Sequence, residues 1–216
     1  MKNVSPKIIQ SVPFIREKVL AVKEVRENSD REATQKLALT PSLFGEIRQP
    51  DSGNYLLVPS TSSERRRYIP IGFLDADTIA TNANLIVPNA SLYEFGVLTS
   101  NVHNGWMRAV AGRLKSDYRY SASIVYNNFP WTTPTKEQRA KIEKTAQAIL
   151  NARNNHPECS LAELYDAVSM PPDLTRAHQD NDRAVMEAYG FWGKVKTESE
   201  CVAELMKMYQ KLTGGK

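Results

Sequence analysis

The side chains best suited to contact a nucleic acid gather between residues 100 and 121. Asn101, His103 and Asn104 fall at the start of a predicted helix, and the segment Arg113-Leu-Lys-Ser-Asp-Tyr-Arg-Tyr-Ser121 follows that helix. Asparagine can pair bidentately with adenine in the major groove, and arginine with guanine. The N-terminus of a helix also offers free amides and a positive dipole end to phosphate. This arrangement predicts a surface that contacts DNA.

The residues at the helix start also have a structural interpretation, and the sequence leaves both open. Asn101 could be only the N-cap of the helix. His103 lies three residues before Trp106 and could simply stack on it. Trp106 itself is typical of a core position rather than of a stacking platform.

The basic and aromatic residues nearby are equally ambiguous. Tyr118 and Tyr120 fit an ordinary strand. Arg65, Arg66 and Arg67 precede a predicted strand, where they could bind phosphate or could form a solvated edge that discourages strand pairing. The basic residues after Gly112 could bind phosphates and so position a duplex without reading it.

The chain lacks the sequence signals of common catalytic sites. Its 10 glycines form neither a P-loop nor a G-x-G-x-x-G motif. The three histidines are scattered, and neither Cys159 nor Cys201 has a Cys or His at metal-ligand spacing. No G-x-S-x-G motif is present. We therefore expect reduced thiols, no metal or cofactor bound to this chain, and no catalysis by the chain alone.

Composition and charge agree with a folded polyanion-binding protein. The 216 residues are 41% hydrophobic and 24% charged, which is typical of globular chains. Residues 1–134 contain 16 Lys and Arg against 12 Asp and Glu, whereas residues 135–216 contain 12 of each, so the net charge of +4 lies in the first part. No apolar run approaches the roughly 20 residues that span a membrane, and the N-terminus has no signal-like stretch. A cytoplasmic protein without membrane contact is expected.

The pattern of the first part predicts mixed helices and strands. Helical spacing over residues 12–40 is broken at residues 28–30. Short β-rich runs at 54–58, 67–71 and 84–87 predict a small sheet, and residues 121–129 also have strand-like composition. Between them, one helix opens at the capping-box pair Ser91/Glu94 and a second begins near Ser100, ending at Gly112.

A domain boundary is predicted at the proline-rich stretch 130–135. Beyond it, helical apolar spacing follows capping-box pairs at Thr135/Gln138, Ser160/Glu163 and Thr197/Glu200, and another helix follows Pro171-Pro172. The fold class is therefore α+β. Residues 1–134 form a small mixed α/β domain, and residues 135–216 form an all-helical domain.

Several long motifs resemble one known family. They are Leu43-Phe-Gly-Glu-Ile-Arg-Gln-Pro50, the segment 62–74, residues 89–108, the basic segment 113–121 with Asn-Asn-Phe-Pro-Trp131, and the helical motifs at 161–166, 170–173 and 178–185. Together they are similar to the C-terminal part of MmeI-like restriction-modification enzymes. These single polypeptides join an endonuclease, an adenine-N6 DNA methyltransferase and a target recognition domain.

The resemblance implies that residues 1–134 are the target recognition domain and that the rest is its helical extension. It also implies that the methyltransferase and nuclease regions, with S-adenosylmethionine and the Mg²⁺ used for cleavage, belong to sequence missing from this fragment. Base contacts are expected from the helix start, and duplex contacts from the basic motif and the arginine run. The predicted DNA-binding residues are Asn101, Val102, His103, Asn104, Arg113, Lys115, Ser116, Arg119, Tyr120, Ser121, Arg65, Arg66 and Arg67.

The leading hypothesis is a sequence-specific double-stranded DNA recognition fragment of a restriction-modification enzyme that methylates adenine. Two other classes stay open. A helical interaction or scaffold module would bind duplex without the steep salt dependence of phosphate contacts. An RNA-binding module would use Tyr118 and Tyr120 as stacking surfaces. An independent enzyme would need turnover by this chain alone.

Overall fold

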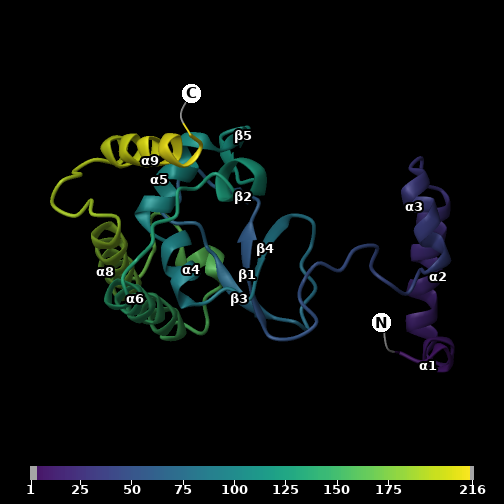
Figure 1. The fold of residues 1–216 in the computed structure, drawn as a ribbon. Helices are drawn as coiled ribbons and strands as arrows, with labels where there is room; N and C mark the ends of the chain where they lie inside the picture. Colours follow the sequence, from purple (N-terminus) through teal and green to yellow (C-terminus); the bar gives the residue numbers. More distant parts are fainter. Residues whose placement is uncertain (1–3, 215–216) are drawn as a thin grey trace. The chain divides into compact units, whose positions relative to one another are not determined.

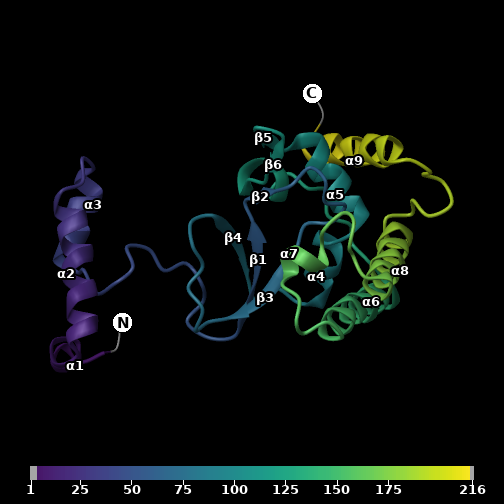
Figure 2. The ribbon, with the colours of Figure 1, turned by 180° about the vertical axis from the view of Figure 1, so that it is seen from behind.

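The computed structural model describes residues 4–214, and the chain divides between Arg48 and Gln49 into two compact units. Figure 1 and Figure 2 show their elements from opposite sides. The helices of the first unit are α1 (Pro6–Ser11), α2 (Pro13–Glu27), α3 (Glu32–Lys36) and the 3-10 turn η1 (Leu37–Leu39). The strands of the second unit are β1 (Asn54–Pro59), β2 (Thr61–Ser62), β3 (Gly72–Asp75), β4 (Asn84–Pro88), β5 (Gly112–Leu114) and β6 (Asp117–Arg119). Its helices are α4 (Leu92–Leu98), α5 (Asn101–Val110), α6 (Lys136–Asn154), α7 (Leu161–Leu164), α8 (Pro172–Ala188) and α9 (Glu198–Leu212), with a π-helical turn, η2 (Ala122–Tyr126). The α+β class is confirmed.

The first unit is a short helical hairpin in which one arginine of α2 binds the returning chain. Helix α2 ends at the break predicted around residues 28–30, and α3 follows it. The Arg26 guanidinium then donates hydrogen bonds to three carbonyls of the returning chain, those of Leu37, Thr40 and Leu43. The Leu37 and Thr40 carbonyls also accept from the backbone N–H groups of Thr40 and Leu43, so the arginine adds a side-chain donor to this turn.

The second unit begins with a three-stranded antiparallel sheet in the order β3-β1-β4. The central strand β1 aligns Leu56 with Phe73 on one side and with Val87 on the other. Leu56 is fully buried and Val58 nearly so. The predicted strands at 54–58 and 84–87 are confirmed.

The strand predicted at 67–71 is wrong. Tyr68 and Ile69 are buried, as their composition suggests, but the backbone there pairs with no strand among the described residues. A side chain supplies the hydrogen-bond partner that a neighbouring strand would otherwise supply, because the Ile69 N–H donates to Oδ1 of Asn104 at 3.0 Å. Pro70 has no N–H to offer a neighbouring strand, and β3 begins only at Gly72.

The strand-like composition of residues 121–129 also misleads. Residues 122–126 form the π-helical turn η2, in which the Asn127 N–H donates to the Ala122 carbonyl at 2.8 Å. The Ser121 hydroxyl caps this turn by accepting from the Ile124 N–H. Val125 is fully buried, and its carbonyl accepts from the Trp106 indole N–H at 3.0 Å. The apolar residues therefore serve a core contact rather than a strand.

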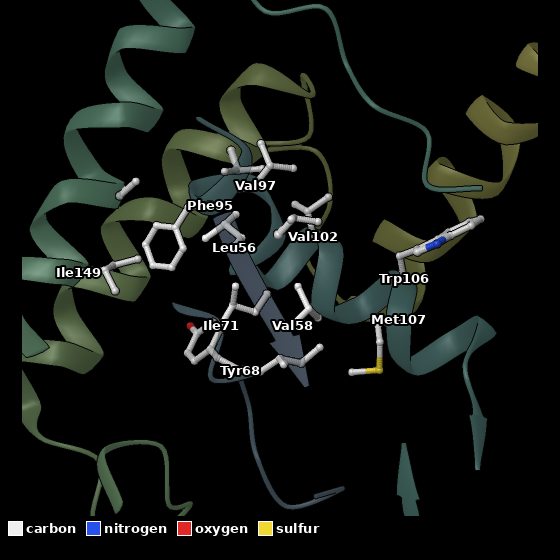
Figure 3. Packing of buried hydrophobic residues seen from close by; sticks show 14 of the residues in the cluster. Leu56, Val58, Tyr68, Ile71, Phe95, Val97, Val102, Trp106, Met107 and Ile149 are labelled. Atoms are coloured by element: carbon white, nitrogen blue, oxygen red, sulfur yellow. The ribbon is translucent and has the colours of Figure 1, made fainter. Parts of the chain in front are cut away.

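One core joins the sheet to the helices on both sides of residue 134. Helix α6 lies beside α4 and α8, and α9 lies beside α5 (Figure 1 and Figure 2). Figure 3 shows Trp106 and Val102 of α5 in the same cluster as Leu56 of β1, Phe95 of α4 and Ile149 of α6. The capping-box pairs at Ser91, Thr135, Ser160 and Thr197 all form, which confirms the predicted helix starts. No helix within residues 4–214 is long and apolar enough to cross a membrane.

Candidate nucleic-acid interface

Two basic segments that are far apart in the sequence meet at a second small sheet, β2-β6-β5. Strand β6 pairs antiparallel with both neighbours, so that Thr61 of β2 lies opposite Arg119. Just after β2, the Glu64 backbone N–H donates to Oδ1 of Asp117 at 3.4 Å, and the Glu64 carboxylate lies 3.7 Å from Arg113. The arginine run that follows Glu64 therefore starts directly beside the β5–β6 hairpin.

The hairpin closes with a two-residue loop. Leu114 pairs with Asp117, so Lys115 and Ser116 form the loop between them. Lys115 has a φ of 56°, the left-handed conformation that tight hairpin loops require. Nη1 of Arg113 donates to the Ser116 carbonyl at 2.7 Å and ties the loop to its strand. The loop therefore holds an exposed lysine at the tip of the hairpin.

The basic side chains of the hairpin remain at the surface. Arg113, Lys115 and Arg119 are all exposed, and within residues 4–214 neither Lys115 nor Arg119 is in an ion pair. The pair of Arg113 with Glu64 is about half exposed on both sides, so water screens it and its contribution is small. The hairpin therefore keeps the net positive charge that attracts a polyanion.

The arginine run has a mixed outcome. Arg65 and Arg67 are exposed and Arg66 is half-buried. The Arg67 guanidinium lies 5.4 Å from the Tyr68 ring, and the Arg67 carbonyl accepts from Arg108. These contacts fix the end of the run and leave its first residue available to a partner.

Three residues in the first turn of α5 do not reach the surface, which corrects their predicted role. Val102, His103 and Asn104 are completely buried. The Asn104 amide is occupied on both sides, because it accepts from the Ile69 N–H and donates to the Ser100 carbonyl at 2.8 Å. These side chains cannot contact DNA in this structure, because the fold itself uses them.

Helix α8 covers the start of α5. The Asn101 backbone N–H donates to Oδ1 of Asp182 at 2.7 Å, and the Tyr68 hydroxyl donates to the other carboxylate oxygen at 2.6 Å. The helix N-terminus therefore faces a protein carboxylate rather than a free phosphate, contrary to the predicted phosphate site. The Asn101 side chain is half-buried and lines a surface pocket of about 410 Å³ together with Arg67 and Arg108. No local sequence signal identifies Asp182, which lies 81 residues from its partner Asn101.

Tyr120 and Ser121 also support the fold. Tyr120 is only 2% exposed, and its hydroxyl lies 2.8 Å from Nε2 of His103 in a hydrogen bond. Burial lowers the pKa of His103 to about 3, so its imidazole is neutral. Ser121 caps η2 and is half-buried. Because Tyr118 is buried as well, the two rings cannot form the open stacking surface expected of an RNA-binding module.

The Arg108 cation is neutralised within the chain. Its guanidinium donates from Nε and Nη2 to both carboxylate oxygens of Glu198 on α9, at 2.8 and 2.6 Å. This bidentate pair holds the pKa of Glu198 below its ordinary value. Within the described part of the chain, no group of three or more Asp, Glu, His or Cys side chains is placed to hold a metal ion.

Comparison with known proteins places these features in a family context. The family models of the MmeI target recognition domain and the MmeI C-terminal domain match residues 1–133 and 134–215. DNA methyltransferase A of Bacillus subtilis (strain 168) is 41% identical over 206 residues, which cover 95% of this chain and 23% of that protein. A solved structure of the Type IIL restriction-modification enzyme MmeI in complex with DNA is 47% identical, with a TM-score of 0.91 over 98% of this chain and 28% of that one. The chain thus spans less than a third of the length of either relative.

Proposed function

We propose that this chain recognises a specific sequence in double-stranded DNA. The chain belongs to the MmeI family through both its target recognition domain and its C-terminal domain. In the complete protein this recognition would direct adenine-N6 methylation from S-adenosylmethionine and Mg²⁺-dependent cleavage. The described residues offer no metal cluster, so other parts of that protein would hold the metal. Such a role places the protein with DNA in the cytoplasm.

The observation that carries the proposal is the exposed basic surface on β2-β6-β5. It consists of the exposed Arg65 and the half-buried Arg66 beside the exposed hairpin residues Arg113, Lys115, Ser116 and Arg119. A two-stranded β-ribbon fits the major groove, which is about 12 Å wide. The cations would neutralise phosphates and fix the register of the hairpin, while side chains near its tip would reach base edges.

The buried residues of the predicted site have a supporting role in this proposal. Asn104 holds the backbone at Ile69 in place, and His103 holds Tyr120 directly after β6. Asp182 anchors Tyr68 directly after the arginine run. They would influence DNA binding by keeping the basic surface in shape, not by contact.

The proposal is tested by the salt dependence of duplex binding. The 216-residue chain is titrated with a fluorescent duplex at several salt concentrations, and the logarithm of the binding constant is plotted against that of the salt concentration. If about four to six phosphates are contacted, the slope should lie between about −3.6 and −5.4. Competition with a pool of random duplexes then measures sequence preference.

Each alternative predicts a different result. A flat plot contradicts the proposal and favours a scaffold module whose charge is incidental. Tighter binding to single-stranded RNA than to duplex DNA contradicts it in favour of RNA recognition. Methylation by this chain alone, assayed with labelled S-adenosylmethionine, would instead reveal an independent enzyme.

A further inference from the structure

A second cavity, of about 690 Å³, is lined by residues of β3, α6 and α7 and shares none of them with the basic surface. Helix α7 lies beside β3 (Figure 2), and a Cβ atom added at Gly72 would lie 3.5 Å from Cδ1 of Leu161. The apolar side chains of the lining include Phe73, Leu150, Leu161 and Leu164. The volume falls within the range of about 300–1,000 Å³ that is typical of ligand sites.

The cavity lies against a free sheet edge. Strand β3 is the outer strand of the sheet β3-β1-β4, and within residues 4–214 it pairs with no strand other than β1. Gly72 and Phe73 of this strand line the cavity. The backbone N–H and C=O groups of an edge strand can pair with a strand from another chain. An extended peptide that adds to β3 points alternate side chains to one face, where the cavity can receive them.

Arg153 of α6 brings a positive charge to the wall of the same cavity. The residue is only 8% exposed and lines the cavity, yet in the part of the chain that the structure describes it has no carboxylate partner. Its guanidinium donates from Nη1 to the Ile71 carbonyl, and from Nε and Nη2 to the Tyr165 hydroxyl. These bonds use three of the five N–H groups of the guanidinium.

The groups that surround Arg153 carry no compensating charge. The Tyr165 hydroxyl oxygen accepts from Arg153, so its proton is donated to Nε2 of His178 at 2.7 Å. Burial and the Arg153 cation lower the pKa of His178 to about 3, so this imidazole is neutral. The ring centres of Phe95 and Tyr165 lie 5.2 and 4.9 Å from the guanidinium carbon and attract it without a negative charge. Buried charges are normally paired, so a carboxylate from a ligand would complete this site.

We propose that this cavity binds an extended peptide of a partner protein, which adds to the free edge of β3 and places an acidic side chain at Arg153. The side chains two residues away on the same face of the peptide are apolar and contact Leu150 and Leu161. Because the cavity shares no residue with the basic surface, this peptide site does not depend on the proposed function.

Fluorescence anisotropy of labelled peptides with the 216-residue chain tests the proposal. The probes are eight-residue peptides with blocked ends, in which threonine alternates with one glutamate and with leucine, valine or phenylalanine. Replacing the glutamate of the tightest binder by glutamine should weaken binding about 10- to 150-fold, because hydrogen bonds between charged groups are lost. Methylating the backbone nitrogens that face β3 should abolish binding, whereas methylating the alternate set should be tolerated.

Two matched variants locate the bound peptide. Leu161→Glu places a carboxylate in the cavity wall, at a residue that is 37% exposed and can accept it. Val168→Glu makes the same change at a residue that is 95% exposed and does not line the cavity. We expect Leu161→Glu to weaken binding of the acidic peptide at least about 10-fold, because the new carboxylate repels the ligand. Val168→Glu should bind it as the wild type does.

The charge itself is tested at Arg153. Arg153→Met keeps an apolar stem and should remove the preference for glutamate over glutamine, whereas Arg153→Lys should retain part of it. Both changes leave the Tyr165 hydroxyl with fewer donors, so melting temperatures are measured in parallel. If these variants do not fold, the pair Leu161→Glu and Val168→Glu still decides the question.

Several results would overturn the proposal. They are equal binding of the glutamate and glutamine peptides, or unchanged binding by Leu161→Glu. Octanoate that binds as tightly as the best peptide would assign the cavity to a small apolar acid, and dimerisation that Leu161→Glu abolishes would assign it to a second copy of the chain. Failure of the proposed function is distinguishable, because it is read from the salt dependence of duplex binding by the wild-type chain.

Discussion

Asp182 carries a buried carboxyl group that joins α8 to the start of α5 and to Tyr68. Burial raises its pKa from 3.8 to about 6, although the hydrogen bonds from Tyr68 and Asn101 and the nearby Arg67 and Arg108 act in the opposite direction. The group remains costly to ionise because its residue is only 5% exposed. Asp182, which holds Tyr68 beside the arginine run, is thus a carboxyl group whose ionised form is destabilised by burial.

A pH dependence of stability follows from this raised pKa. Between pH 4 and pH 6 the folded protein binds the Asp182 proton more tightly than the unfolded chain does, so the contribution of this group to stability falls as pH rises. The unfolding free energy of the wild type minus that of Asp182→Asn should therefore decrease by up to about 3 kcal/mol from pH 4 to pH 7. Urea unfolding of both proteins across this range measures the difference.

The comparison between variants is essential because two histidines act in the opposite sense. Burial lowers the pKa of His103 and His178 to about 3, so the folded state loses stability as pH falls below the unfolded value of 6.5. The contribution of these histidines to the unfolding free energy is present in both proteins, so it cancels when the value for the variant is subtracted from that for the wild type. Asp180→Asn, at an exposed site on the same helix, is the control. A difference that does not change with pH would contradict the raised pKa of Asp182.

At the scale of elements, capping-box pairs predicted helix starts correctly, whereas β-rich composition at 67–71 and 121–129 predicted strands that do not form. Capping boxes involve residues three apart, so the helix starts at Ser91 and Thr135 could be predicted. The segment 67–71 could not, because its buried N–H is paired by Asn104 of another element. The same distance hid the burial of the α5 start, since its covering carboxylate comes from Asp182 on α8. The predicted hairpin residues are therefore exposed and stay a proposal for DNA contact, whereas Val102, His103 and Asn104 of the helix are buried.

Packing between helices makes a second prediction, from two glycines in helix interiors. A Cβ at Gly96 of α4 would lie 2.7 Å from Cγ2 of Ile142 and 3.2 Å from Cβ of Ala146, both on α6. Gly96→Ala should therefore lower the unfolding free energy by about 1–3 kcal/mol, because the core cannot yield. This loss outweighs the helix-propensity gain of about 1 kcal/mol.

Gly105 of α5 provides the matched comparison. Its nearest neighbour would be Cγ of Glu198 at 3.2 Å, part of a flexible and half-exposed side chain that can move aside. Gly105→Ala should be much less damaging than Gly96→Ala in the same urea titration, because the propensity gain is retained. Equal losses in the two variants would show that the α4–α6 approach is not the limiting contact.

The division into compact units differs from the division between the two family models. The first compact unit ends at Arg48, whereas the family models divide at residues 133/134, next to the predicted boundary, and residues on both sides of that boundary share the core of the second unit. Trp106 of α5 lies 6.0 Å from Tyr209 of α9, measured between ring centres. Buried Arg153 of α6 donates to the Ile71 carbonyl at 2.8 Å. Such contacts between distant segments cannot be predicted from local composition. The prolines at 130–135, by contrast, are visible in the sequence and predict a boundary there.

This arrangement predicts which fragments of the chain fold. Residues 49–216 contain the complete core of the second unit and should fold alone, with a cooperative thermal transition and dispersed amide resonances. Residues 49–134 lack α6, α8 and α9, which would expose Phe95, Val97 and Trp106 to water. Apolar surface of that extent makes a fragment unfolded or aggregated. Limited trypsin digestion of the whole chain should accordingly leave a stable product that begins near Gln49, since Arg48 is the last residue of the first unit. A stable product ending near Lys136 instead would mean that the second unit folds as two independent halves.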